Sequence, residues 1–334
     1  MAEYRHWRET KRTALKDVVP LDTPYNVEAE ISSYCNARCV YCAHSVEHGQ
    51  YEGNMTWDLF ERIIGDMKAF PKKVKKFNLF GFGEALCNPK FPEMAKHAKK
   101  SDVAEAVEFT TNGLLITKEK ADEILEAGID TIRISLQGIN SESYWQMCRV
   151  KVDFEKFIEN LKYLYDHRGN TKIRVKIGDL ALKGIPDGEA KFKQCFGGVA
   201  DSIYVEHILP IYDGVSYDNL DESIKQDAIN GRMHVEQKQI NKVCHRAFYR
   251  LRIRANGDVT AMCCDATRDV KYGNIYEQSL PELWNGSAHR NFLIMQLKGK
   301  RFEHPYCKDC MMPNDITTEA DLLDPWAERI LERI

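Results

Sequence analysis

The sequence contains no long apolar run and no large excess of charge of one sign. Its 334 residues carry 47 Lys and Arg against 50 Asp and Glu, which gives a formal net charge of −3 at pH 7. This balance favours neither nucleic acid nor an anionic membrane as a partner. No stretch of about 18 apolar residues is present to cross a membrane, and residues 1–24 lack the apolar core of a signal peptide. We therefore expect a cytoplasmic protein.

Internal repeats and low-complexity tracts are also missing, whereas cysteine is plentiful. With 43% hydrophobic residues, the chain is long enough to bury a core without disulfide bonds. A reducing cytosol keeps thiols free, so the 11 cysteines do not suggest a disulfide framework. They divide into two groups and three single residues: Cys35, Cys39 and Cys42; Cys244, Cys263, Cys264, Cys307 and Cys310; and Cys87, Cys148 and Cys195. We interpret the two groups as sets of thiolate ligands.

Strand-like and helix-like segments alternate along the first two thirds of the chain. The β-branched or aromatic runs are 25–32, 76–82, 106–112, 131–137, 172–178 and 202–208, and helical periodicity is clearest at 56–70, 117–128 and 153–168. This alternation indicates βαβ units and hence a parallel sheet with right-handed crossovers. We predict an α/β fold with a partial (β/α)6 TIM-type barrel, whose functional loops follow the carboxyl ends of the strands.

A change of pattern in the last third predicts a second, smaller domain. The stretch 213–240 is polar and is typical of a connecting segment with one helix. After it, "YRLRIRANGDVTAMCC" (249–264) has two short strands around an Asn-Gly turn, which indicates a hairpin. We divide the chain into an N-terminal extension (1–24), a core barrel (25–212), the connecting segment (213–240) and an α+β domain that ends in a helix (241–334).

The first cysteine group lies in "YCNARCVYCAHS", directly after the first predicted strand and so at the functional face. Three thiolates spaced as Cys35-x₃-Cys39-x₂-Cys42 can hold a [4Fe–4S] cluster and leave one iron open to a substrate or cofactor. A structural zinc site is the alternative, because His44 could supply the fourth ligand that tetrahedral zinc requires. Tyr41 is an aromatic residue that could lie against a purine.

This motif, after the first strand of a βα barrel, resembles the signature of the radical S-adenosylmethionine (radical SAM) enzymes. The resemblance implies that the amino and carboxylate groups of SAM chelate the open iron. It further implies that one electron from the cluster cleaves SAM to methionine and a 5′-deoxyadenosyl radical, which abstracts a C–H hydrogen. An external one-electron reductant such as flavodoxin or ferredoxin would supply the electron.

Polar residues follow the next three predicted strands at the same face. "GFGEAL" (81–86) is similar to the GGE motif of the family, although Phe82 is interposed, and this implies that Gly83 and Glu84 hold the SAM amino group. Glycine permits close backbone approach to a ligand, and a carboxylate is a partner for an ammonium group. A tight turn with a solvated Glu84 is the alternative. The next two strands end in "TTNG" (110–113) and "SLQG" (135–138). The resemblance implies that Asn112, Ser135 and Gln137 in these motifs contact the ribose and carboxylate of SAM.

The second cysteine group resembles the C-terminal SPASM or shorter twitch domains of these enzymes. The resemblance implies a second [4Fe–4S] cluster held by four thiolates, namely Cys244, Cys263, Cys307 and Cys310, with Cys264 as the alternative to Cys263 because the register departs by one place. A structural zinc ribbon is the competing interpretation. A fully ligated cluster has no open iron, so it would exchange an electron rather than bind substrate.

The resemblance leaves the reaction open. Loss of an electron from the substrate radical would make the enzyme a dehydrogenase, whereas hydrogen return from a cysteine would make it an epimerase. The candidate donors are Cys148, Cys195 and Cys264, although a single cysteine is more often a core residue. "PLDTPYNVEAEISSYCN" (20–36) resembles enzymes encoded with carbohydrate biosynthesis, and no leader-binding segment typical of peptide modifiers is found. We expect a small sugar-like or aminocyclitol substrate. A peptide-modifying enzyme, a non-catalytic electron-transfer protein and a zinc-binding module remain alternatives.

Overall fold

The structure is a computed structural model of the chain, and it describes residues 2–4, 12–42, 53–208, 222, 241–261, 270–308, 310 and 312–334. Most of the predicted connecting segment, 213–240, therefore lies outside the described residues. Within them, no helix has the length and apolar character needed to span a bilayer.

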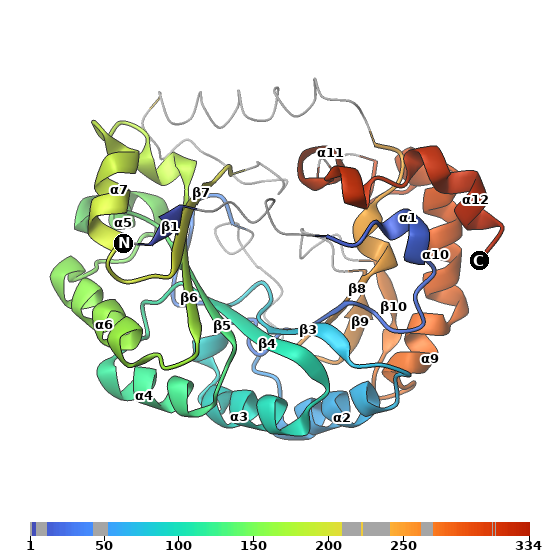
Figure 1. Ribbon diagram of the computed structural model, residues 1–334, viewed down its shortest axis with the longest axis horizontal. Coiled ribbons are helices and arrows are strands. Elements are labelled where there is room, and N and C mark those ends of the chain that lie inside the picture. Colours follow the sequence, from blue (N-terminus) through green and yellow to red (C-terminus); the bar gives the residue numbers. More distant parts are fainter. Residues whose placement is uncertain are drawn as a thin grey trace.

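One curved sheet of ten strands organises the described residues, in the order β1-β7-β6-β5-β4-β3-β2-β8-β9-β10 (Figure 1). Its centre consists of β2 (Asn26–Ala29), β3 (Val74–Leu79), β4 (Ala104–Thr111), β5 (Thr131–Leu136), β6 (Lys172–Gly178) and β7 (Ser202–Glu206). These strands correspond to the six predicted runs, and each pairs in parallel with its neighbours. The predicted α/β fold with a partial barrel is confirmed.

Helices cover the convex side of this sheet (Figure 1). They are α2 (Trp57–Lys68), α3 (Phe91–Ser101), α4 (Lys118–Glu126), α5 (Ser141–Cys148), α6 (Phe154–His167) and α7 (Gly188–Phe196), with short 3₁₀ turns η3 (Ala85–Cys87) and η4 (Asp179–Leu182). Thr56, Thr117 and Asp153 begin α2, α4 and α6, and each side chain accepts a backbone N–H of the first turn. The three helical segments predicted from periodicity are confirmed.

The two faces of the strands differ in chemistry. On the outer face, Phe77 of β3 stacks against Phe60 of α2 with ring centroids 6.0 Å apart, and Phe109 of β4 lies 4.7 Å from Phe91 of α3. The alternate residues of the same strands, such as Lys76, line the inside of the barrel. Successive side chains on a strand point to opposite faces, so the hydrophobic core lies between sheet and helices while the lumen is polar.

The C-terminal part continues the same sheet. Its strand β8 (Arg250–Ile253) pairs in parallel with β2, and the predicted hairpin at the Asn256-Gly257 turn is confirmed by the antiparallel pairing of β8 with β9 (Asp258–Thr260). The remaining elements are β10 (Lys271–Asn274), α9 (Leu280–Asn285), α10 (Ser287–Leu297), α11 (Met312–Ile316) and α12 (Ala327–Leu331), with the 3₁₀ turns η5 (His245–Phe248), η6 (Lys300–Glu303), η7 (Glu319–Asp321) and η8 (Asp324–Trp326). Main-chain hydrogen bonds thus cross the predicted boundary at residue 241, and the domain limits stay a prediction.

Two short elements of the N-terminal region pack against different parts of the fold. The two-residue strand β1 (Glu3–Tyr4) pairs with β7 at one edge of the sheet, while α1 (Leu15–Val18) packs near η7 of the C-terminal part. The predicted N-terminal extension therefore contacts both arms of the open barrel.

Candidate active site

The first cysteine motif forms the loop that follows β2. Cys35, Cys39 and Cys42 line one cavity of about 230 Å³ at the carboxyl ends of the central strands. The loop is fixed from behind by α5, because the backbone N–H groups of Arg38 and Val40 each donate to carbonyl oxygens of that helix over 2.9 Å. Three thiols therefore face one cavity at the end of the barrel where parallel α/β folds place their functional loops.

The electrostatic setting of these thiols fits a cationic cluster. Burial raises the pKa of Cys35 to about 12 and the pKa of Cys39 well above its usual value, and neighbouring thiols add to both shifts. Thiols in this setting stay neutral unless positive charge is bound among them, and iron supplies that charge. Within the described residues, no three His, Cys, Asp or Glu side chains are arranged to hold a single metal ion. His44, the possible zinc ligand, lies outside the described residues.

Gly83 allows the loop after β3 to approach the cysteine loop. A Cβ atom at this position would lie 2.3 Å from the backbone oxygen of Ser32 and 2.6 Å from that of Tyr34. The next residue, Glu84, donates its backbone N–H to the Tyr34 carbonyl over 2.7 Å. Only glycine fits this contact, so Gly83 sets the position of one cavity wall against another.

Glu84 joins the ends of two strands and lines the same cavity as the cysteines. Its side chain is buried; one carboxylate oxygen accepts from Thr111 Oγ1 (2.8 Å) and from Leu86 N (3.1 Å), and the other accepts from Asn112 N (2.7 Å). Burial raises the pKa of Glu84, and the three hydrogen bonds oppose that shift. The alternative of a solvated Glu84 is wrong, because the carboxylate is enclosed and hydrogen-bonded.

Asn112 contacts the cysteine loop directly from the end of β4. Its Nδ2 donates to Asn36 Oδ1 over 2.7 Å and lies 3.9 Å from Cys35 Sγ. Its Oδ1 accepts from Leu114 N over 2.9 Å. These contacts fix the amide beside the first cysteine.

Tyr41 and Gln137 make a second contact between the loop and the strand ends. The Tyr41 hydroxyl hydrogen-bonds to Gln137 Oε1, and Gln137 Nε2 donates to the backbone oxygen of Ser135 over 3.3 Å. All three residues line the cysteine cavity. The structure thus brings together all the residues to which the sequence assigned SAM contacts, around the three cysteines.

The candidate hydrogen donors are placed differently. Cys148 is fully buried at the end of α5, where its thiol donates to the Tyr144 carbonyl over 3.1 Å, and burial raises its pKa to about 11. Cys195 lies on the outer helix α7. Neither lines the cysteine cavity, so the geometry gives no support to either as a donor. Cys264 lies outside the described residues, and Cys87 sits in η3 behind Glu84.

Three of the C-terminal cysteines also come together. The fully buried Gln296 of α10 accepts from Cys244 N over 3.0 Å through Oε1, and its Nε2 lies 3.8 Å from Cys307 Sγ. Burial raises the pKa of Cys307 to about 12, and Cys244 and Cys310 raise it further. The buried Arg301 donates to the Cys310 carbonyl over 2.6 Å. Cys263, the fourth expected ligand, lies outside the described residues.

The interposed Phe82 connects the two parts of the chain. Its backbone N–H donates to Glu30 Oε1 over 3.0 Å, and the guanidinium groups of Arg252 and Arg254 lie 4.2 Å and 5.9 Å from its ring centroid. Arg252 in turn forms a buried ion pair with Glu28. The departure from the GGE pattern therefore has a structural role. The extra aromatic residue packs the loop after β3 against Arg252 of β8 and against Arg254, which follows β8.

A second cavity in the barrel lumen was not foreseen from the sequence. It measures about 380 Å³ and shares Phe80, Lys176 and Glu206 with the cysteine cavity. Its charged lining comprises Arg12, Lys76, Arg133, Arg174, Lys176, Arg246 and Arg250, together with Glu108 and Glu206. The available signal was the alternation of basic and aliphatic residues in "IRI", "IRVKI" and "RLRIR", which indicates cations on one face of several strands.

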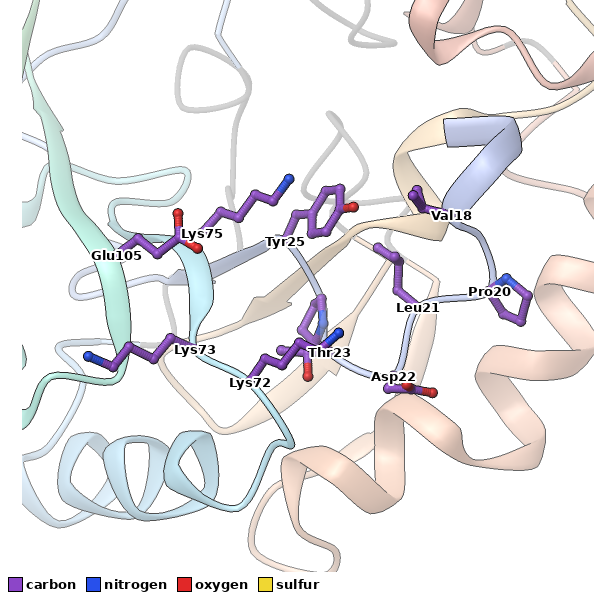
Figure 2. Close-up of a pocket in the computed structure, with 11 residues that line it drawn as sticks. Val18, Pro20, Leu21, Asp22, Thr23, Tyr25, Lys72, Lys73, Lys75 and Glu105 are labelled. Carbon is purple, nitrogen blue, oxygen red and sulfur yellow. The ribbon is translucent and has the colours of Figure 1, made fainter. Parts of the chain in front are cut away.

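A larger cavity of about 660 Å³ lies at the opposite ends of the strands (Figure 2). Lys72, Lys73 and Lys75 line it, and Tyr25, which precedes β2, lies beneath the Lys75 ammonium at 3.6 Å from its ring centroid. Lys73 pairs with the exposed Asp102 over 2.5 Å. Because the amino ends of barrel strands serve stability rather than chemistry, we do not assign the active site here.

Comparison with known proteins agrees with this geometry. Residues 29–192 match the model of the radical SAM superfamily, and residues 244–311 match the model of the SPASM iron–sulfur cluster-binding domain. A tungsten-containing aldehyde ferredoxin oxidoreductase cofactor-modifying protein of Pyrococcus furiosus is 25% identical over 332 residues, which cover 89% of this chain and 90% of that protein.

Two solved structures show the same fold. BtrN in complex with AdoMet and 2-DOIA has a TM-score of 0.53 at 19% identity, over 86% of this chain and 92% of BtrN. SuiB of Streptococcus suis bound to S-adenosylmethionine has a TM-score of 0.62 at 15% identity, over 92% of this chain and 79% of SuiB. The chain belongs to the radical SAM superfamily and carries a C-terminal SPASM domain. It is an enzyme of the class that uses [4Fe–4S] clusters and SAM.

Proposed function

We propose that the protein is a radical SAM dehydrogenase that oxidises a small, sugar-like substrate held in the barrel lumen. The observation that carries the proposal is the shared cavity of Cys35, Cys39 and Cys42 with Glu84 and Asn112, which opens onto a polar lumen. Enzymes of this superfamily act on small molecules or peptides and require a reductant. A one-electron donor such as flavodoxin or ferredoxin would serve.

The residues have distinct roles in this proposal. When bound, SAM and its cluster supply a 5′-deoxyadenosyl radical that removes a hydrogen atom from carbon, and a second cluster supplies a one-electron acceptor. Cys35, Cys39 and Cys42 would hold the first cluster, and Glu84 would accept hydrogen bonds from the SAM ammonium. Asn112, fixed beside the first thiol, would orient the same ligand.

The purine side of the site would be formed by neighbouring polar residues. Tyr41 offers a ring for the adenine, and its hydrogen bond to Gln137 fixes the ring's position. Ser135 lies beside Gln137 and offers a hydroxyl to the ribose or carboxylate of SAM. These groups would hold SAM out of bulk water and keep the radical directed at the lumen.

Proton removal from the substrate needs a base near both cavities. Glu206 and Lys176 line both of them and form an ion pair with each other. Burial alone would lower the pKa of Lys176, but Glu206 raises it above its usual value, so Lys176 is protonated beside Glu206. We assign Glu206 the role of proton acceptor when the substrate is oxidised.

Two features favour oxidation over the alternatives. Cys148 and Cys195 do not line the cysteine cavity, which removes support for an epimerase that uses either thiol. Besides burial, Cys244 and Cys310 both raise the pKa of Cys307, and Gln296 contacts the Cys307 thiol and the Cys244 backbone N–H, which supports an electron acceptor held by these three residues. BtrN, which has the same fold, was crystallised with AdoMet and 2-DOIA, which supports a small molecule as substrate.

Iron content tests this proposal directly. Protein reconstituted without oxygen should hold roughly eight irons with matching sulfide, because each cubane holds four. The triple variant C35A/C39A/C42A should hold about four and should no longer cleave SAM. If wild type holds only about four irons and the variant none, the C-terminal cysteines bind zinc or nothing. The electron acceptor, and with it the dehydrogenase assignment, would then be lost.

A further inference from the structure

A buried amide connects two of the C-terminal cysteines. Gln296 of α10 is fully enclosed, and its Oε1 accepts the backbone N–H of Cys244 over 3.0 Å. Its Nε2 donates to the sulfur of Cys307, 3.8 Å away. Enclosing a polar side chain costs free energy, which its hydrogen bonds offset. An apolar side chain would fill the same space without that cost, so the amide has a role other than packing.

A buried cation contacts another cysteine of this group. Arg301 is 2% exposed and donates to the backbone oxygens of Cys310 over 2.6 Å and of Asn241 over 3.1 Å. Within the part of the chain that the structure describes, its Nε has no hydrogen-bond partner. Burial raises the pKa of Cys307, whereas Arg301 and Gln296 both act to lower it. The two side chains therefore favour negative charge on the Cys307 sulfur.

The same preference acts on the reduction potential of a cluster held by these cysteines. A [4Fe–4S] core with thiolate ligands carries net negative charge, and that charge increases when the core accepts an electron. Hydrogen bonds to the ligand sulfurs and nearby positive charge therefore stabilise the reduced form more than the oxidised form, which raises the potential. We infer that Gln296, through its N–H group on the Cys307 sulfur, raises the potential of the second cluster and so fits that cluster to accept an electron from the substrate radical.

Gln296 is thus a positioning residue that acts through Cys307. The inference deepens the proposed function and rests on its assignment of the second cluster as the electron acceptor. Once a hydrogen atom has left the substrate, completing the oxidation requires the loss of one electron and one proton. The electron reduces the second cluster, and the proton passes to Glu206. A higher potential of the second cluster favours the electron transfer and leaves SAM cleavage at the first cluster unaffected.

A redox titration of the second cluster tests the inference. The full-length variant C35A/C39A/C42A, reconstituted without oxygen, should hold the second cluster alone, so that electron paramagnetic resonance (EPR) reports only its reduction. In this background Gln296→Met keeps a side chain of similar length but removes the N–H donor. It should lower the reduction equilibrium constant by about threefold to tenfold, where tenfold corresponds to about 59 mV for a one-electron couple.

The matched control is Gln278→Met. Gln278 precedes α9 in the same part of the chain, and its side chain is exposed. The substitution is chemically identical to that at Gln296 but removes no hydrogen bond to a cysteine sulfur. The midpoint potential should therefore stay at the value of the parent variant.

A second measurement leaves residue 296 unchanged. Protein of the same C35A/C39A/C42A background, labelled with ¹⁵N at its glutamine side-chain amides, should show a weak ¹⁵N hyperfine coupling in pulsed EPR of the reduced cluster. The coupling arises because the amide N–H bonds to a ligand sulfur that carries unpaired spin. Gln278→Met should retain this coupling. If Gln296→Met fails to bind a cluster, the labelled protein still decides the question.

Three results would overturn the inference. These are an unchanged midpoint potential in Gln296→Met, an equal shift in Gln278→Met, and no ¹⁵N coupling in the protein that retains Gln296. Iron content separates the two levels of the argument. If C35A/C39A/C42A holds no iron, the second cluster is missing and the proposed function fails; if it holds about four irons and the potential does not depend on Gln296, only this inference fails.

Discussion

Two regions of the molecule present cysteine thiols, and they do so in different settings. In the loop after β2, Cys35, Cys39 and Cys42 face a cavity whose other walls are polar strand ends. In the C-terminal part, Cys307 is buried and packed against the amide of Gln296. The first arrangement leaves room for a further ligand beside the thiols, whereas in the second Cys307 is buried and Cys244 and Cys310 are half-buried. The difference agrees with our proposal that the first region performs the chemistry and the second accepts an electron.

The largest expected effect comes from removing the thiols of the first region. C35A/C39A/C42A should reduce SAM cleavage to background, because no group remains to hold the cluster with the open iron. The measurement is 5′-deoxyadenosine formed with dithionite under anaerobic conditions, quantified by chromatography. If this variant still cleaved SAM, the first region would not be the site of the chemistry, and the proposed difference between the two regions would be wrong.

Removing the thiols of the second region should give a different phenotype. C244A/C307A/C310A should keep SAM cleavage, because the first region is untouched, but should form no oxidised product. The expected signature is 5′-deoxyadenosine without product, and loss of about four irons, one cubane. Oxidised product at the wild-type rate would show that the second cluster is not the electron acceptor.

Gly83 tests how closely the walls of the first region must meet. Gly83→Ala places a methyl group 2.3 Å from a backbone oxygen, so we expect a loss of about 1–3 kcal/mol in unfolding free energy and weaker SAM binding. The matched control is Gly65→Ala in α2, where a Cβ would meet nothing within 4 Å. That change should stabilise the protein by about 0.5–1 kcal/mol. Similar behaviour of the two variants in chemical denaturation would show that the loops are not in tight contact.

The local sequence pattern predicted most of the fold, but it did not predict the pairing of β8 with β2 or the strand β1. The six central strands alternate with amphipathic helices, a pattern that short segments reveal by themselves. The pairing of β8 with β2 brings together Arg250 and Asn26, which lie far apart in the sequence. No local periodicity identifies a partner strand at such a separation. The strand β1 has two residues, too few to produce any period.

The site was predictable only where the residue type is chemically specific. The spacing of Cys35, Cys39 and Cys42 indicates a cluster by itself, and polar residues at strand ends follow from the fold. The lumen cations were missed, because each of Arg133 and Arg174 sits between aliphatic neighbours and looks like the polar face of an ordinary strand. A barrel interior is usually filled by branched aliphatic side chains, so the alternation of basic and aliphatic residues did not by itself place these cations inside the barrel.

The last prediction concerns the hydrogen bond between the cysteine loop and the strand ends, where we expect an effect no larger than that at Gly83. Tyr41→Phe removes the hydroxyl that bonds to the buried Gln137, which leaves an enclosed amide oxygen without that donor. We expect a loss of about 1–3 kcal/mol in unfolding free energy and SAM binding weakened by up to about tenfold. Tyr163→Phe is the control, because the Tyr163 hydroxyl bonds to Asp122 at an exposed position. Its loss should lower the unfolding free energy by less than Tyr41→Phe does. Equal effects of the two changes in denaturant titration would mean that the polar strand ends do not hold the loop, and that backbone contacts such as the one at Gly83 shape the first region alone.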